Sequence, residues 1–263
     1  MTKARGFTLI EMVLSITLLG IVGLFVGEVI RLSLTLYSDV EARSSLIQQG
    51  RFATERLRRE IREAVPNSVV TNSSGRCVEF FPIVNSGIYT NLPTLSPSNT
   101  LRALPFKKDA GKKGDWIAVY PTSNAQLRTS IIPTNSQVAV LERDIEFSPD
   151  ISSTMIDIEL ASATKFANNS PANRFYVYSQ PVAFCIVGDE LRRYDGYGMD
   201  RILEPGDTSL GSGVVLVDSL LGGNFLAQEA QLQRNGLVKI ELTFTGNGEV
   251  MRFDDDALVY NTP

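Results

Sequence analysis

Residues 6–27 read GFTLIEMVLSITLLGIVGLFVG and decide how this chain is built. The residues before them carry Lys3 and Arg5 and no acid, and from residue 7 to residue 27 the only formal charge is Glu11. A basic flank beside one apolar segment holds the N-terminus in the cytoplasm and sends the rest of the chain across the membrane. The large C-terminal part is therefore expected to be extracytoplasmic.

Three interpretations of this segment compete: a cleaved secretory signal, a plain membrane anchor and a more specialised signal. A secretory signal needs a small-residue cleavage site after its apolar core, and residues 25–31 read FVGEVIR, which fits poorly. A plain anchor has no use for a carboxylate such as Glu11, because a charge at depth costs at least ~2.5 kcal/mol on insertion scales. The specialised signal is therefore favoured.

The segment Gly6-Phe7-Thr8-Leu9-Ile10-Glu11, with a short basic leader and about twenty apolar residues after it, resembles the class III signal of type IV pilins and type II secretion pseudopilins. The resemblance implies that a prepilin peptidase cuts between Gly6 and Phe7 on the cytoplasmic side. It also implies that Phe7 becomes the N-methylated first residue. The apolar segment then stays on the mature protein, and residues 1–6 are removed as a leader.

Glu11 would be the fifth residue of the mature chain. A methylated amine at the end of a bare apolar helix still holds a positive charge, and Glu11 is predicted to pair with that amine on a neighbouring subunit, with no partner in its own chain. Opposite charges attract far more strongly in a low-dielectric bundle than in water. The alternative is that Glu11 reaches the lipid headgroups at the helix end.

Glycines are predicted to mark a packing face in the membrane segment. Gly20, Gly23 and Gly27 lie on nearly one side of a helix, and Gly23 with Gly27 has the small-xxx-small spacing that suits close helix approach. The pilins that the signal resembles often have a proline eight residues after the Gly20 position, where this chain has Glu28. Glu28 and Arg31 have the spacing of an ion pair at the membrane exit.

Helical periodicity continues beyond the membrane. Apolar residues recur at Ala53, Leu57, Ile61 and Ala64, with arginines available for the other face. Residues 7–64 are therefore predicted to form one helix of about 87 Å at ~1.5 Å per residue. Its transmembrane half spans about residues 7–27, and Pro66 ends it.

The rest of the chain, residues 65–263, has the texture of a β-rich globular domain. Short apolar runs alternate with turn residues, and 188–189 and 246–248 are hairpin signals. The fold class is therefore α+β: a pilin-like long helix packed on an antiparallel sheet. Segments 86–99 and 161–173 are predicted to be surface loops. The predicted strands are 77–81, 116–120, 137–141, 155–160, 175–178, 182–187, 191–194, 214–217, 237–244, 250–253 and 258–260.

Composition removes most catalytic chemistry. The 263 residues include no histidine, which excludes the Ser-His-Asp triad and histidine-containing zinc sites, and the net charge of −4 makes nucleic acid an unexpected partner. The two cysteines, Cys77 and Cys185, are expected to form a disulfide in an oxidising compartment; the alternative is two buried thiols. No cofactor is expected.

Other charged and glycine-rich clusters are interpreted as ordinary surface features. Two acidic groups are expected to be solvated acidic turns, with calcium binding as a weak alternative, and a basic cluster is expected to be a solvated loop. Gly-x-Gly elements are expected to be turns, because they lack a strand-glycine-helix context. The first acidic group is the run Asp254, Asp255 and Asp256, and the second is Asp195 with Asp200 and Asp207; the basic cluster is Lys107, Lys108, Lys112 and Lys113; the glycine elements are 196–198 and 211–213.

The resemblance extends past the signal. Residues 48–62, 65–68, 77–80, 184–185 and 191–194 are similar to MshO-type minor pilins of the mannose-sensitive haemagglutinin (MSHA) pilus. J-type minor pseudopilins of type II secretion share the arginine-rich late helix and are the alternative. A globular part of this size suits a low-copy subunit at the tip or base of a filament.

The resemblance implies a non-enzymatic minor pilin that initiates, primes or caps pilus assembly. Its expected partners are other major and minor pilins, the prepilin peptidase and an inner-membrane assembly platform. Its expected location is the inner membrane, single-pass with the globular domain in the periplasm, and then the pilus, at its tip. A tip adhesin module and a periplasmic enzyme on an anchor are the other function classes, and the missing histidine disfavours the enzyme.

Overall fold

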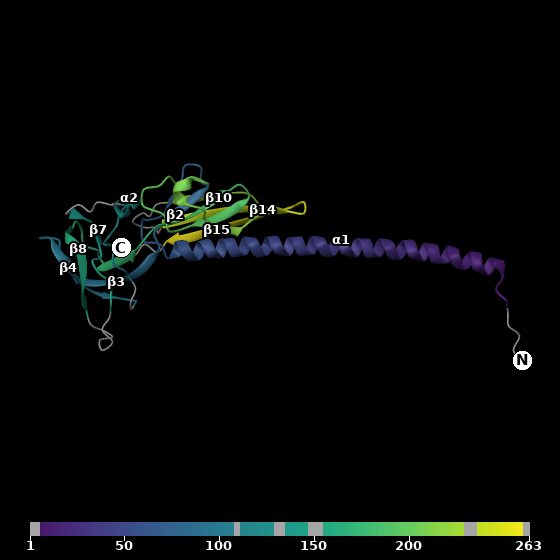
Figure 1. Ribbon diagram of the computed structural model, residues 1–263, viewed down its shortest axis with the longest axis horizontal. Coiled ribbons are helices and arrows are strands. Elements are labelled where there is room, and N and C mark those ends of the chain that lie inside the picture. The colour runs from purple at the N-terminus through teal and green to yellow at the C-terminus, as the bar shows by residue number, and fades with distance from the viewer. Residues whose placement is uncertain (1–5, 108–110, 129–134, 147–154, 229–235, 260–263) are drawn as a thin grey trace, which may run out of the picture.

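A single helix dominates the molecule. The computed structural model describes residues 6–107, 111–128, 135–146, 155–228 and 236–259. Helix α1 (Leu9–Arg62) is 54 residues long, and its N-terminal half extends away from every other element (Figure 1). The prediction of one helix over 7–64 is confirmed to within two residues at each end. The helix stops because the next residues join the sheets: the Val65 N–H donates to the Phe81 carbonyl at 2.8 Å.

In the described part of the chain three sheets follow the helix, where the sequence predicts one. Their strand pairs are antiparallel, apart from the short parallel pair β6 with β8. The first sheet has the order β1 (Val70–Thr71), β2 (Cys77–Phe80), β10 (Val182–Val187), β11 (Glu190–Tyr194) and β12 (Val214–Val217). The second has the order β13 (Leu220–Gln228), β14 (Gly236–Gly246) and β15 (Glu249–Val259).

The third sheet has seven strands and lies beyond the C-terminal end of α1 (Figure 1). We call it, with the short helix α2 (Asn124–Leu127), the distal lobe; the other two sheets form the proximal lobe. A 3-10 turn, η1 (Thr208–Leu210), lies in the connection to β12. The third sheet has the order β6 (Asn135–Ser136), β8 (Ile156–Phe166), β4 (Ser98–Pro105), β3 (Ile83–Asn91), β9 (Arg174–Tyr178), β5 (Trp116–Ala118) and β7 (Val138–Val140).

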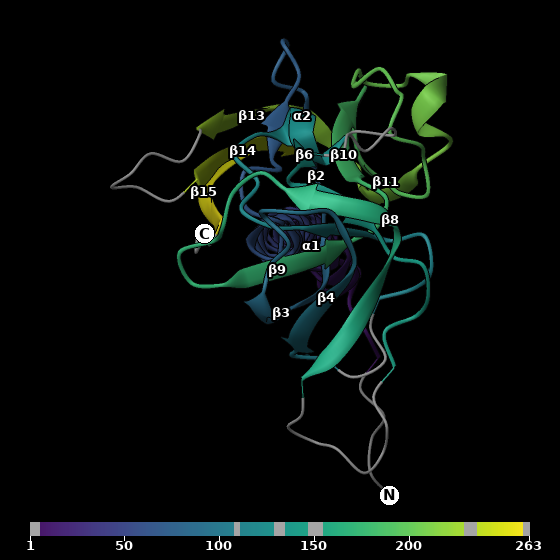
Figure 2. The ribbon, with the colours of Figure 1, turned by 90° about the vertical axis from the view of Figure 1, so that its left-hand side faces the viewer.

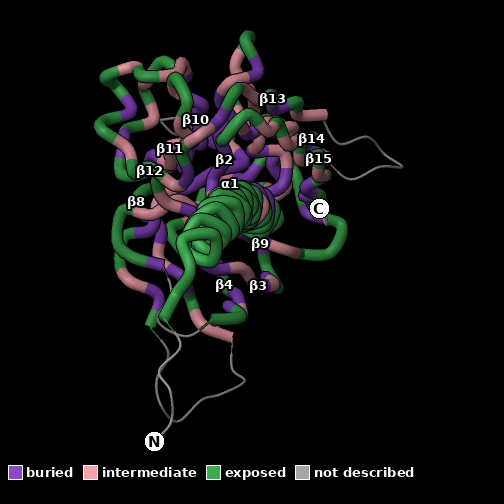
Figure 3. The backbone as a smooth tube through the Cα atoms, turned by 90° about the vertical axis from the view of Figure 1, so that its right-hand side faces the viewer, coloured by how far each residue is buried: buried purple, intermediate pink, exposed green. Residues whose placement is uncertain are grey.

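The proximal lobe wraps around the last turns of α1. Figures 2 and 3 show β13 to β15 and β2, β10 and β11 next to each other over the same side of the helix, so that the two sheets form a concave wall against it. Leu57 and Ile61 are fully buried there among Phe80, Phe184 and Phe244. Apolar burial at the predicted helical spacing therefore joins the helix to both sheets.

The two hairpin turns predicted from glycine are confirmed. Gly188-Asp189 joins β10 to β11, and Asn247-Gly248 joins β14 to β15 with φ of 49° and 79°. Positive φ at both central residues is the turn type that matches the twist of the flanking strands. The Gly-x-Gly elements lie outside the strands, as expected, and Gly211 and Gly213 also have positive φ.

Both predicted surface loops are wrong in part: residues 92–97 and 167–173 do connect strands, but the rest of each segment is strand. Segment 86–99 holds most of β3 and the start of β4, and segment 161–173 holds the second half of β8. The polar and small residues of these segments favour a loop in sequence analysis, but in β3 they let the backbones of neighbouring strands approach closely. A Cβ on Gly87 would lie 2.3 Å from the Leu104 carbonyl oxygen. The buried Tyr89 hydroxyl on β3 accepts from the Ser170 N–H at 2.7 Å. Close backbone approach therefore takes the place of apolar alternation.

The acidic run 254–256 is not a turn. It lies within β15, which continues unbroken across the two separately predicted strands, apart from Tyr260, which lies outside the described residues. Each of the three aspartates pairs in register with β14, from Glu241 to Lys239. The ladder with β14 therefore overrides the low strand propensity of aspartate.

Candidate assembly site

Thr8 and Glu11 close the first turn of α1. The Thr8 hydroxyl accepts a hydrogen bond from the Glu11 N–H at 3.4 Å, and the Glu11 carboxylate accepts one from the Thr8 N–H at 3.2 Å. This reciprocal pair is a capping box, with the carboxylate at the positive end of the helix dipole. The prediction that Glu11 has no partner in its own chain is therefore wrong. The helix begins at Leu9, which makes Glu11 the third helical residue, within reach of the cap.

The predicted processing point lies just outside this cap. Gly6 and Phe7 precede the helix, both are exposed, and the Phe7 side chain is 79% exposed. An added Cβ at Gly6 would meet nothing within 4 Å. An exposed peptide bond outside the helix is accessible to a protease, so this geometry is compatible with the predicted cut.

Within the described residues, no other element covers the first half of α1. Every residue from 6 to 41 is exposed, and Figure 3 shows this part of the helix exposed all round. Leu19 and Leu24 are each 78% exposed. Leaving such a side chain in water costs ~1.5–3 kcal/mol relative to burying it. A helix this long and apolar is able to cross a membrane.

The polar groups of the exposed half are largely satisfied within the helix. Ser15 donates to the Glu11 carbonyl at 2.7 Å and Ser33 to the Val29 carbonyl at 2.8 Å. Glu28 and Arg31 form the predicted ion pair at 2.8 Å. The backbone and these hydroxyl groups therefore make their hydrogen bonds within the helix, which is the condition for a helix to enter lipid or a helix bundle.

Gly20, Gly23 and Gly27 have open space around them: an added Cβ would meet nothing within 4 Å at any of the three. The fold of the single chain therefore gives no reason for these glycines. Their role in helix packing stays a prediction, since it depends on a neighbour.

Comparison with known families identifies one region. Residues 1–27 match the family model described as the prokaryotic N-terminal methylation motif. Over these residues the chain is similar to type IV pilins and pseudopilins. Proteins of this kind are structural and not enzymes, and the apolar helix with its motif indicates an inner-membrane anchor. Neither a curated protein nor a solved structure matches the chain.

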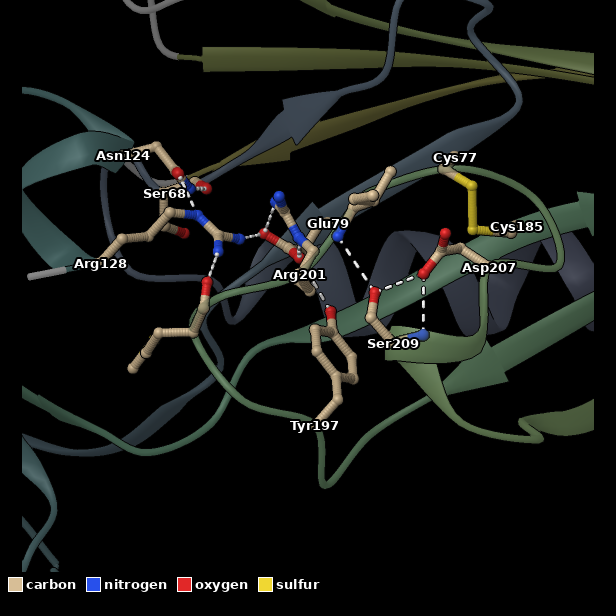
Figure 4. A network of polar contacts seen from close by, with 12 residues as sticks. Ser68, Cys77, Glu79, Asn124, Arg128, Cys185, Tyr197, Arg201, Asp207 and Ser209 are labelled. Atoms are coloured by element: carbon tan, nitrogen blue, oxygen red, sulfur yellow. Dashed lines mark hydrogen bonds and ion pairs between the residues drawn. A yellow bond between two sulfur atoms is a disulfide. The ribbon is translucent and has the colours of Figure 1, made fainter. Parts of the chain in front are cut away.

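The pilin-like chain also contains a buried polar cluster that sequence reasoning missed (Figure 4). Glu79 on β2 is fully buried and forms ion pairs with Arg128 and Arg201. The Arg201 guanidinium donates from Nε at 2.6 Å and from Nη2 at 2.7 Å, and the Tyr197 hydroxyl donates at 3.0 Å. Charge-assisted bonds of this kind offset the cost of burying a carboxylate.

This cluster joins the two lobes. Arg128 follows α2 in the distal lobe, where its Nε donates to Asn124 at 2.7 Å. Its Nη1 donates to the carbonyl of Met199, in the connection between β11 and β12 of the proximal lobe, at 2.8 Å. Burial and the nearby Arg201 lower the pKa of Arg128 to about 10, and burial raises the pKa of Tyr197. No sequence motif connects positions 79, 128, 197 and 201. The only signal of this cluster in the sequence is that Glu79 is an acidic residue within an apolar run.

The disulfide prediction is confirmed. Cys77 and Cys185 are bonded, directly opposite each other on β2 and β10, and the residues they join are 108 apart in sequence. Both are fully buried in the proximal lobe.

Several charged residues of the predicted clusters are bonded to other groups of the chain. Within the described residues no group of three or more His, Cys, Asp or Glu side chains is placed to hold a metal ion. Asp195 pairs with Arg193, and Asp207 accepts from the Ser209 N–H at 2.8 Å. In the basic cluster, Lys112 pairs with Asp144 at 2.9 Å and Lys113 with Glu142 at 3.0 Å; Lys108 lies outside the described residues.

Proposed function

We propose that this chain is a minor pilin that takes part in initiating, priming or capping a type IV pilus of the MSHA type. One observation carries the proposal. Residues 6–41 form a largely apolar segment that is exposed in the single chain, so it needs a neighbouring subunit to cover it, and the segment begins within a methylation motif. A J-type minor pseudopilin of a secretion system has the same requirement and is the alternative.

The proposed path starts with removal of residues 1–6 by the prepilin peptidase between Gly6 and Phe7 and methylation of Phe7. The inner-membrane platform then moves the helix out of the bilayer among other pilins. The capping box holds Glu11 by only about 1 kcal/mol. A neighbour's terminal amine, as a charged donor in a low-dielectric bundle, is a stronger partner and takes the carboxylate from Thr8.

The distal lobe supports a place at the tip. In Figures 1 and 2 its strands β3, β4 and β9 lie beyond and across the end of α1, in the direction away from the membrane. A subunit added earlier would occupy that space in a filament whose helices run along its axis. A subunit with nothing above it has room for this lobe.

The first test is on processing and assembly. Intact-mass analysis of the membrane-extracted chain is expected to show an N-methylated Phe7; a start near Glu28 or later means ordinary signal cleavage and defeats the proposal. In a strain that lacks the native copy, Glu11→Ala is expected to insert normally and to reduce filament number. Glu28→Ala is the matched control, because that carboxylate has its own partner in Arg31.

A further inference from the structure

We infer that the face of α1 turned away from the proximal lobe, between Arg51 and Arg62, is a docking surface for a carboxylate-bearing neighbouring subunit of the same assembly. This inference rests on the proposed function and names a contact within it. We call this surface the arginine face. It consists of Arg51, Phe52, Glu55, Arg58, Arg59 and Arg62.

The arginine face lies opposite the buried stripe of the helix. Ala53, Leu57 and Ile61 point into the proximal core, and the exposed residues between them fall on the other side at 100° per residue. A groove of about 490 Å³ is lined there only by helix residues: Phe52, Glu55, Arg56, Arg58, Arg59 and Arg62. The two lobes therefore leave this side of α1 uncovered.

The charge of this surface is out of balance. Glu55 is its only acid, and Arg56 at its border is already paired with Glu60. Arg51 and Arg59 form no ion pair within the described residues, and Arg58 reaches Asp255 only at 3.8 Å. The face is positive on a chain whose net charge is −4. Such local excess charge selects a partner of opposite sign.

The residue types are those of an interface. The basic residues of α1 are all arginine, whereas the loop cluster of the distal lobe is all lysine. Arginine and aromatic residues are enriched in protein interfaces and lysine is depleted, because the planar guanidinium binds carboxylates in a bidentate manner. Phe52 is 50% exposed among these arginines and supplies an apolar anchor. The helix dipole accounts for Arg59 and Arg62 in the last turn, but it does not account for Arg51 or Phe52.

Position along the helix excludes the bilayer as the partner. Residue 52 lies 25 residues beyond residue 27, about 38 Å at ~1.5 Å per residue, so headgroups at the end of the membrane segment are out of reach. The neighbours available at that height are subunits whose own helices rise beside this one. Their carboxylates are the chemistry that the arginine face fits.

The test uses the full chain in assembling cells. A photoreactive p-benzoylphenylalanine is placed at Phe52, and the adduct is identified by mass spectrometry. We expect cross-linking to a chain that carries an N-terminal methylation motif, in a peptide that contains Asp or Glu. The double variant Arg51→Glu with Arg59→Glu is expected to reduce the adduct about tenfold, while Lys107→Glu, which changes an exposed charge elsewhere, leaves it unchanged.

The possible failures separate the two proposals. If sheared filaments contain the chain but position 52 gives no adduct, or the adduct is unaffected by charge reversal or joins a lipid or a chain without the motif, the docking inference is wrong and the minor-pilin proposal stands. If the filaments never contain the chain, the proposed function fails as well. A non-reducing gel that shows the Cys77–Cys185 bond verifies that each variant is folded.

Discussion

The two halves of α1 have the same backbone and opposite surroundings. Residues 9–41 are exposed on every side, whereas from Leu46 onward one stripe is buried by two sheets. The second half is stabilised by contacts within its own chain. The first half is largely apolar and stays uncovered in the described chain, apart from the hydrogen bond that Asp39 accepts from Asn247 at 2.7 Å, so its stabilisation has to come from lipid or from other subunits.

Glycine shows the difference at single residues. A Cβ at Gly23 would meet nothing within 4 Å, whereas a Cβ at Gly50 would lie 2.2 Å from the ring of Phe253. Gly50 is required by the folded chain because β15 approaches the helix there. Gly23 has no such cause in the single chain, so any constraint on it comes from assembly.

The largest expected effect is in the packed region, at Glu79. Replacing Glu79 with Ala leaves Arg128 and Arg201 without their shared carboxylate in the interior, and one-sided loss of a buried pair costs ~3–5 kcal/mol. The free energy of unfolding of the full chain in detergent, measured by denaturant titration of Trp116 fluorescence, is expected to fall by that amount. Glu28→Ala, in the exposed half, is the control. A loss below about 1 kcal/mol would mean that the cluster does not hold the lobes together.

The next effect compares the same substitution in both halves. Leu57 is fully buried and Leu19 is 78% exposed. Leu57→Ala is expected to lower the free energy of unfolding by ~2–5 kcal/mol, since it removes apolar contacts and leaves a cavity. Leu19→Ala is expected to leave it unchanged. Equal losses in the same denaturant titration would show that the exposed half already packs within one chain.

A smaller effect is expected at high pH. Burial raises the pKa of Tyr178 and Tyr197 above the ordinary value of about 10. Between about pH 10 and the raised pKa values, the folded chain holds protons that the unfolded chain has lost. The free energy of unfolding therefore falls as pH rises through this window, and the contribution of these tyrosines to stability is complete below it. Tyr197→Phe is expected to reduce this slope. A stability that is constant from about pH 9 to about pH 11 would contradict the burial argument.

The sequence predicted the parts of the molecule that depend on local pattern. The helix, its end near Pro66, the turn at Asn247-Gly248 and the disulfide follow from periodicity, turn chemistry and cysteine count, and each is confirmed. Those signals operate within a few residues or depend on residue type alone.

What the sequence did not predict depends on contacts between distant segments. Strand β3 needs close backbone approach at Gly87, and the aspartates of β15 stay in a strand because β14 pairs with each of them. The ion cluster around Glu79 unites residues more than 100 positions apart. At the candidate assembly site the motif identified Glu11, but its bond to Thr8 depended on which residue begins the helix, and boundaries are the least predictable feature of an element.

The smallest effect on stability is expected at the cap, and it isolates what holds Glu11 before assembly. Thr8→Ala removes the hydroxyl that accepts from the Glu11 N–H while keeping the carboxylate and the predicted cleavage site. Loss of an N-cap costs ~1 kcal/mol locally, so amide exchange in the first turn, measured in micelles, is expected to rise about fivefold. The free energy of unfolding of the packed lobes is expected to stay constant, because no contact links this turn to them within the described residues.

Filament number in the Thr8→Ala variant is expected to be kept or raised, since a carboxylate released from its own cap is free to pair with a neighbour's amine. A loss of filaments as large as that of Glu11→Ala would instead show that the cap itself, and not the free carboxylate, is what the neighbouring subunit recognises.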